Sequence, residues 1–263
     1  MRQPTYFISH GGGPWPWIDD MRAALAPLEE SLAALPSQLP EPPAAALMIS
    51  GHWEAPEVRV MHGARPPMVY DYSNFPPHTY EITYPAPGAP ELAEKAAQLI
   101  AEAGLPVALD DTQGYDHGTF VPAYVMYPQA DVPVFQVSML ESYDPADHFR
   151  LGRALAPLRD AGVVIIGSGL SYHNLRLFGP DARVPSEAFD AWLGETLARP
   201  MAERTARLID WESAPHARTC HAREDHLVPL FAALGAAEDA VATRVYTQEM
   251  VFGGVTASSW RFG

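Results

Sequence analysis

Short apolar runs alternate with helical patterns along most of the chain. Five of these runs are continuous and too short for ordinary helices, which is typical of strands buried on both faces. They span residues 5–9, 45–50, 106–110, 132–139 and 163–169. Two further segments near the carboxyl end, 243–250 and 255–263, predict strands that join the sheet in the antiparallel direction.

Amphipathic stretches separate the predicted strands. Apolar residues recur at helical spacing over 19–35, where acidic residues stand at the start. Segments 90–104 and 144–162 each have a proline near the beginning and a glycine at the end, the usual asymmetry of a helix. This alternation predicts an α/β fold, a three-layer α/β/α single domain over residues 1–263 with a largely parallel, mixed central sheet.

Two proline-containing segments, 36–43 and 65–90, lack this periodicity. The first is a connector, whereas a loop as long as the second is usually functional inside a compact domain. Its aromatic side chains either form the wall of an aromatic pocket or pack on the surface. These side chains are Tyr70, Tyr72, Phe75 and Tyr80.

Charge and cysteine content narrow the possible partners and the compartment. The chain has 17 Lys and Arg against 32 Asp and Glu, a net charge of −15, which disfavours nucleic acids and anionic membrane surfaces. Its single cysteine, Cys220, excludes an intramolecular disulfide. No signal-peptide core or membrane-spanning apolar stretch is evident. We therefore expect a cytoplasmic protein, a monomer or small homo-oligomer, with no nucleic-acid or membrane partner.

The placement of the ten histidines is more informative than their number. Because the carboxyl ends of parallel strands share one edge, histidines that follow different strands converge there. A histidine after one strand is ordinarily a hydrogen-bonded loop residue, but four such placements favour a shared site, and imidazole binds first-row metals well. His226 lies in the first turn of a predicted helix over 224–234, which faces the same crevice. The four that follow strands are His10, His52, His117 and His173.

Two widespread catalytic and metal-binding motifs are incomplete in this sequence. The stretch "SHGGGPWPW" (9–17) is similar to the oxyanion loop of lipases, but no G-x-S-x-G nucleophile turn accompanies it, and "GLSYH" (169–173) is the nearest match. A H-E-x-x-H pair is also missing, and the spacing in "HARTCHARED" (216–225) matches no zinc template. We therefore expect neither a serine hydrolase nor a structural zinc site, and interpret 216–225 as a polar loop.

Longer motifs spread over the whole chain are more specific. They are "FISHGGGPW" (7–15), "ISGHWE" (49–54), "NFPPHTYEITYPAPGAPELAE" (74–94), "YDHGTFVPAYVMYPQADVPVFQVSM" (115–139), "GSGLSYHNLR" (167–176), "EDHLVPLFAALGAA" (224–237) and the terminal "SSWRFG". In these segments the sequence resembles the class III extradiol ring-cleavage dioxygenases, in particular the DOPA 4,5-dioxygenase type.

The resemblance implies roles for the five histidines. His10, His52 and His226 match metal ligands of the family. His173 matches a histidine beside the metal, which acts either as the catalytic acid and base or as a further metal ligand. His117 matches a catalytic histidine near the substrate hydroxyls.

The implied reaction opens a catechol ring next to its two hydroxyls and inserts both atoms of O2. It needs a small aromatic diol and one divalent metal, with Fe(II) expected and Zn(II) possible, because three histidines also suit catalytic zinc. A zinc-dependent hydrolase that uses a metal-bound hydroxide, and a non-enzymatic binding protein on the same fold, are the alternatives.

One motif departs from the family pattern. Many relatives have His-Gly-Ser-Pro where this chain has "HGGGPWP" (10–16), which leaves the substrate open. The glycines would let the backbone turn sharply and approach the ion. Trp15 and Trp17 either shape the catechol pocket or pack the loop.

Overall fold

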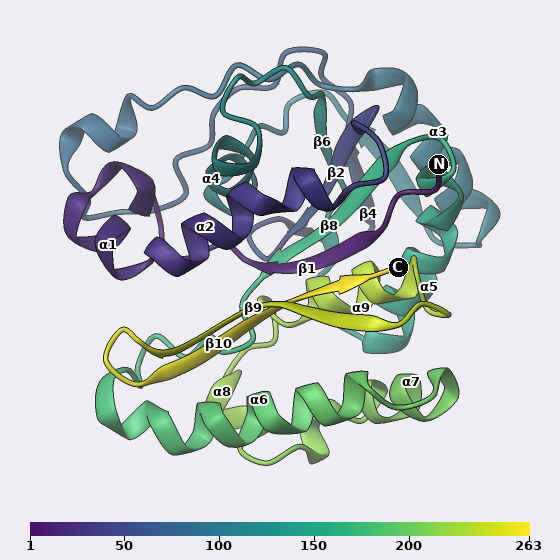
Figure 1. The fold of residues 1–263 in the computed structure, drawn as a ribbon. Helices are drawn as coiled ribbons and strands as arrows, with labels where there is room; N and C mark the ends of the chain where they lie inside the picture. Colours follow the sequence, from purple (N-terminus) through teal and green to yellow (C-terminus); the bar gives the residue numbers. More distant parts are fainter.

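The continuous apolar runs form a six-stranded sheet at the centre of the fold (Figure 1). The computed structural model describes residues 1–263, and the strand order is β6-β2-β8-β1-β10-β9. Neighbours among β6, β2, β8 and β1 pair in parallel, whereas β10 is antiparallel to both β1 and β9. The largely parallel, mixed sheet is therefore confirmed. The strands are β1 (Thr5–Ser9), β2 (Ala45–Ser50), β6 (Val134–Gln136), β8 (Val163–Gly169), β9 (Ala242–Val251) and β10 (Val255–Phe262).

Helices cover both faces of this sheet, which makes the three predicted layers. On one face, α4 contacts β2 and β8, and α2 packs against α4 and β9. On the other, α9 contacts β1, β2 and β8, α5 packs on α9, and α6 lies along β10 (Figure 1). The α-helices are α1 (Asp19–Ala24), α2 (Ala26–Ala34), α3 (Pro90–Glu102), α4 (His117–Met126), α5 (Pro145–Leu155), α6 (Arg183–Leu197), α7 (Met201–Ile209), α8 (Ala217–Cys220) and α9 (Val228–Gly235). Short 3-10 helices are η1 (Trp15–Trp17), η2 (Leu35–Gln38), η3 (Pro77–Tyr80), η4 (Ala156–Arg159), η5 (Gly179–Ala182) and η6 (Trp211–Ser213).

Two predicted strands differ from the structure. The strand predicted over 106–110 is β5 (Val107–Asp110), which pairs only with β4 (Val58–Met61) in a separate two-stranded sheet. Its side chains are half-buried or exposed, so its burial on both faces was wrong. The run over 132–139 divides into β6 and β7 (Met139–Leu140), and β7 leaves the main sheet to pair with β3 (Glu54–Ala55).

Two predicted helices are interrupted by proline. The helix over 19–35 divides at Leu25, and Pro27 stands in the first turn of α2, where no backbone donor is needed. The helix over 144–162 ends as an α-helix at Leu155 and continues as η4.

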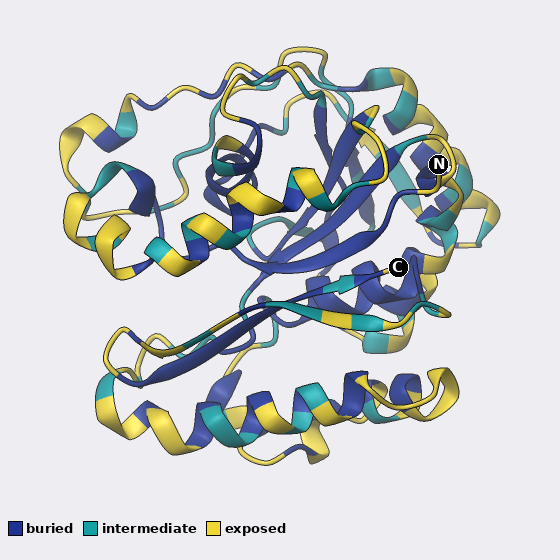
Figure 2. Ribbon diagram, viewed as in Figure 1, coloured by how far each residue is buried: buried dark blue, intermediate teal, exposed yellow.

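The interior forms one continuous hydrophobic cluster of 68 buried residues. Figure 2 shows the central strands in dark blue and the outer faces of the covering helices in yellow, as expected for a sheet between two helical layers. None of the helices is both long and apolar enough to cross a membrane.

Candidate metal centre

Three of the histidines reach one edge of the sheet because their strands are neighbours. His10 directly follows β1, His52 follows β2 after one glycine, and His173 lies beyond β8, which runs between β1 and β2. The predicted convergence is confirmed for these residues. His117 is not placed by a strand of the main sheet, because β5, the strand before it, lies outside that sheet. His117 is instead the first residue of α4, which packs on β2 and β8.

His226 comes from the opposite helical layer. It does not lie within the first turn of a helix, because α9 begins at Val228 and His226 belongs to the preceding turn. The turn presses against the end of β8: a Cβ at Gly169 would lie 2.1 Å from the His226 carbonyl oxygen. Glycine at that position therefore lets the two segments meet.

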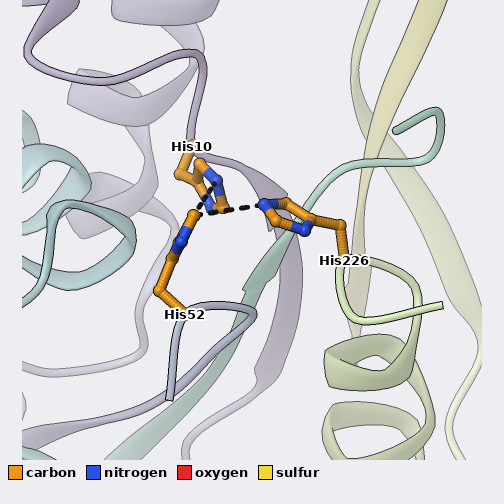
Figure 3. A group of neighbouring side chains, drawn as sticks. All are labelled: His10, His52 and His226. Atoms are coloured by element: carbon orange, nitrogen blue, oxygen red, sulfur yellow. Dashed lines mark hydrogen bonds between the residues drawn. The ribbon is translucent and has the colours of Figure 1, made fainter. Parts of the chain in front are cut away.

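The imidazoles of His10, His52 and His226 point toward a common centre (Figure 3). The Nε2 atom of His52 lies 3.3 Å from Nε2 of His10 and 3.1 Å from Nε2 of His226. His10 is 1% exposed and His226 2%, so the centre is largely removed from solvent.

Neighbouring groups hold the outer nitrogens of two of these rings. His10 Nδ1 lies 3.1 Å from Ser168 Oγ, and the Ser168 hydroxyl itself donates to the Gly118 carbonyl oxygen. The hydroxyl therefore accepts from an Nδ1–H of His10. His52 Nδ1 lies 3.2 Å from Asp71 Oδ2, a carboxylate that also accepts. Both contacts place the ring proton on Nδ1 and direct an Nε2 lone pair to the centre.

The third ring is held by a second carboxylate. His226 Nδ1 lies 3.3 Å from Asp225 Oδ2, and His173 Nδ1 lies 3.4 Å from Asp225 Oδ1. The ring of His173 stacks on that of His226 with centroids 3.4 Å apart, so His173 adjoins the three-nitrogen centre from one side. Burial alone would raise the pKa of Asp225, but the two adjacent histidine rings outweigh it and lower that pKa.

The electrostatics keep the three central rings uncharged. Burial, followed by the neighbouring histidines, lowers the pKa values of His10 and His52 well below the ordinary value. Burial also lowers the pKa of His226 to about 4. At neutral pH the three rings are therefore uncharged, and each uncharged imidazole has one nitrogen lone pair to offer a cation.

This donor set fits a divalent cation. Two nitrogens bound to one metal at about 2.1 Å, at angles between roughly 90° and 110°, lie about 3.0–3.4 Å from each other. The observed separations of 3.1 and 3.3 Å fall in that range. Neutral imidazole suits Fe(II) and Zn(II) alike.

The two carboxylates were missed by sequence reasoning. Asp71 bridges two rings, since its Oδ1 accepts from the backbone N–H of His117 at 3.0 Å and lies 2.9 Å from His117 Nδ1, while Oδ2 faces His52. Asp71 lies in the irregular loop 65–90, where no spacing marks it. Asp225 had a signal, because it directly precedes His226.

A cavity of about 490 Å³ opens over the centre, and all five histidines line it. The tyrosine-rich loop forms part of its wall through Tyr72 and Phe75. Tyr70 and Tyr80 do not line the cavity, and both pack against Tyr72 with ring centroids 6.2 and 5.4 Å away. The loop therefore contributes residues that line the cavity and residues that pack against Tyr72 and support it.

The glycines after His10 make room for aromatic rings. Gly11 has a φ of +79°, and a Cβ there would lie 2.5 Å from the Trp15 ring. Gly13 has a φ of +53°, and its Cβ would lie 2.7 Å from the Phe75 ring. The sharp turn was correctly predicted, but ring packing is a further reason for glycine at both positions.

The two tryptophans of this segment pack the loop and do not line the cavity. Trp15 is fully buried and donates from Nε1 to the His10 carbonyl oxygen at 2.8 Å. Trp17 packs on Tyr124 with centroids 4.6 Å apart.

The interpretation of 216–225 as a polar loop was wrong in part. The segment contains α8, and both Cys220 and His221 are fully buried. The Cys220 thiol donates to the Pro185 carbonyl oxygen at 3.3 Å, and His221 Nε2 lies 3.1 Å from the Ser171 carbonyl oxygen. These groups belong to the packing beneath the cavity and do not line it.

Comparison with known proteins shows the family to which this chain is similar. The sequence profile described as "Catalytic LigB subunit of aromatic ring-opening dioxygenase" matches residues 5–263. The chain is 39% identical over 237 residues to "4,5-DOPA dioxygenase extradiol" of Beta vulgaris, covering 89% of this chain and 86% of the relative. It is 36% identical over 265 residues to "Dioxygenase tasH" of Hapsidospora irregularis, covering 94% and 82%. The crystal structure of an Escherichia coli K12 protein described as uncharacterized superposes with a TM-score of 0.80 at 28% identity, covering 100% of both chains.

Proposed function

Because the chain belongs to the LigB family of aromatic ring-opening dioxygenases, we propose that it opens a catechol-type ring next to its two hydroxyls and inserts both atoms of O2. The substrates of this extradiol cleavage are a small aromatic diol and O2. The single observation that carries the proposal is the convergence of three histidine Nε2 atoms at the floor of a cavity.

His10, His52 and His226 are the residues that would hold the metal. Bound there, Fe(II) would lower the pKa of a coordinated substrate hydroxyl and supply the redox chemistry that O2 activation needs. Ser168, Asp71 and Asp225 keep the three rings in the required tautomer and orientation, as hydrogen-bonded partners do at other histidine sites.

His173 is the proposed proton carrier. Its Nδ1 lies 3.4 Å from the Asp225 carboxylate, which orients the ring, and the side chain lines the cavity. A neutral His173 accepts a hydroxyl proton of the diol at its other nitrogen and returns it as the ring opens.

His117 is proposed to position the diol. Its Nδ1 and backbone N–H are both held by Asp71 Oδ1, so the ring is fixed and Nε2 remains an acceptor for a substrate hydroxyl. The same carboxylate holds His52, so positioning and metal binding share one anchor.

The test is anaerobic loading with Fe(II), followed by a panel of catechols in air. Oxygen uptake in step with a yellow ring-opened product supports the proposal. Absence of oxygen uptake across the panel contradicts it. Oxygen-independent hydrolysis of esters or amides by the Zn(II)-loaded protein would instead support a zinc-dependent hydrolase, because three histidines also suit catalytic zinc.

A further inference from the structure

The lining of the cavity has two chemically different parts. Three of its five histidines are buried, whereas three of its apolar side chains reach solvent: Leu175 is 68% exposed, and Phe178 and Phe252 are each 41% exposed. Phe178 and Phe252 meet edge to face with ring centroids 5.5 Å apart. We call Leu175, Phe178 and Phe252 the apolar rim.

Phe252 is held at the rim by a strained backbone conformation. It has a φ of 50°, in the left-handed region that bulky residues rarely adopt, within the turn between β9 and β10. A Cβ on Gly12 would lie 3.8 Å from the tip of the Phe252 ring, so this ring reaches over the loop that follows His10. Strained placement of an apolar side chain beside a site suggests a binding role.

Away from the histidines, no side chain in the cavity is available to bind a charged substituent. Lysine and arginine are absent from the lining. The carboxylate of Asp71 is already shared by His52 and His117. The hydroxyls of Tyr72 and Tyr172 donate to the carbonyl oxygens of Thr79 and Leu177, which leaves their rings to face the cavity.

The cavity is also larger than the diol ring alone requires. Its volume of about 490 Å³ lies within the range of roughly 300–1,000 Å³ that encloses drug-sized ligands, whereas catechol has only eight heavy atoms. With the two hydroxyls at the histidine floor, a ring substituent extends toward the apolar rim.

We propose that the preferred substrates are catechols with an uncharged, apolar side chain, and that the apolar rim selects them over catechols with a carboxylate. The inference rests on the proposed ring cleavage. A carboxylate placed at the rim loses hydration without gaining a partner, whereas an alkyl chain buries apolar surface.

A matched pair of substrates tests the preference. 4-Propylcatechol and 3-(3,4-dihydroxyphenyl)propanoate differ only by a methyl group against a carboxylate at the end of the chain. We expect kcat/KM for 4-propylcatechol to be at least about tenfold higher. Equal or faster turnover of the propanoate would overturn the inference and would point to the backbone N–H groups of residues 11–13 as carboxylate donors.

Rim variants locate the effect. Phe178→Ser and Phe252→Ser should each lower kcat/KM for 4-propylcatechol about tenfold and lower that for unsubstituted catechol by a smaller factor. Val241→Ser, at an exposed apolar position outside the cavity, is the matched control and should change neither value. Equal losses on both substrates would mean that the rim does not contact the substituent.

A cation added at the rim should reverse the preference. Leu175→Arg is expected to raise kcat/KM for the propanoate about tenfold relative to 4-propylcatechol. Arg176→Ala tests the exposed arginine next in the chain, which does not line the cavity, and should leave both values unchanged. A selective loss of propanoate turnover in Arg176→Ala would contradict the proposal.

Anaerobic calorimetry separates this inference from the proposed function. Tighter binding of 4-propylcatechol than of the propanoate by the metal-loaded protein supports the rim even if neither compound is cleaved. Oxygen uptake at equal rates with both compounds would retain the proposed function and overturn the rim preference.

Discussion

Two sets of buried histidines have different surroundings in this fold. His10 and His226 at the cavity floor and His148 and His221 in the packing layers are all at most 2% exposed. Burial lowers the pKa in every case. Burial and a low pKa therefore do not separate a candidate ligand from a structural histidine.

The partners of the ring nitrogens separate His148 from the floor set. His148 uses both nitrogens on backbone: Nδ1 donates to the Asp144 carbonyl oxygen at 2.7 Å, and Nε2 accepts from the Leu140 N–H at 3.1 Å. In the floor set, each Nδ1 faces a protein acceptor while Nε2 faces only other imidazoles. One unpartnered nitrogen is not sufficient to mark a site, since His221 Nδ1 in the packing layers also has no partner. The floor differs because three Nε2 atoms from separate segments converge there.

Removing one ring from the metal centre and one from the packing layers should give the largest contrast. His52→Ala is expected to lose bound metal and ring-cleaving activity almost completely, because two nitrogens remain where three are needed. His148→Phe should keep its metal but lose stability by roughly 1–3 kcal/mol for each backbone group left unpaired. Metal analysis and urea unfolding of both variants provide the comparison; unchanged metal content in His52→Ala would refute the ligand set.

Removing the ring of His173 should distinguish a role in proton transfer from a role in metal binding. His173→Ala is expected to lower kcat by about 10²–10⁴-fold while the metal content stays at the wild-type level, as for the loss of a proton carrier. A stopped-flow pH profile that loses one ionisation would accompany the loss. Parallel loss of metal would instead place His173 among the ligands.

A smaller effect is expected when only a supporting hydrogen bond is removed. Ser168→Ala leaves His10 Nδ1 without its acceptor and should weaken metal affinity by about 10–100-fold. Ser186→Ala removes another buried hydroxyl, which accepts from the Thr256 N–H, and serves as the control with unchanged affinity. Competition with a chromophoric chelator measures both; equal affinities would exclude an orienting role for Ser168.

The smallest expected effect is on the pH dependence of stability, through the structural histidine His148. The pKa of His148 is lowered by burial, so the folded state binds fewer protons than the unfolded state. Its contribution is complete above the unfolded pKa of about 6.5 and is lost as the pH falls toward the folded pKa, by about 1.4 kcal/mol per pH unit. The stability gap between wild type and His148→Phe should therefore narrow from pH 7 to pH 5. A constant gap in urea unfolding would contradict this linkage.

Sequence patterns predicted the centre of the fold better than its periphery. The bounds of β1, β2 and β8 match their apolar runs, since strands covered on both faces contain almost no polar residue. β5 was misplaced because a short apolar run does not reveal which sheet it joins. Helices α6 and α7 were not predicted at all, although they cover β10 and its surroundings.

The residues of the site that directly follow a strand of the main sheet could be predicted from the sequence. His10, His52 and His173 follow neighbouring strands, so topology alone brings them together. Asp71 reaches the site through an irregular loop, and nothing in its spacing indicates a contact with two histidines. Phe252 of the apolar rim likewise depends on the turn between β9 and β10, whose backbone conformation no periodic pattern records.

The position of β1 has a consequence for the order in which the chain is made. This strand is synthesised well before its two neighbours, which are β8 and β10, at Val163–Gly169 and Val255–Phe262. Until those residues are synthesised, β1 has no partner on either side, and His10 has neither Ser168 nor His226 beside it. Pairings this distant in sequence fold slowly. The three-histidine cluster therefore cannot assemble before His226 is translated. A product truncated before β10 would leave β1 as an open, aggregation-prone edge.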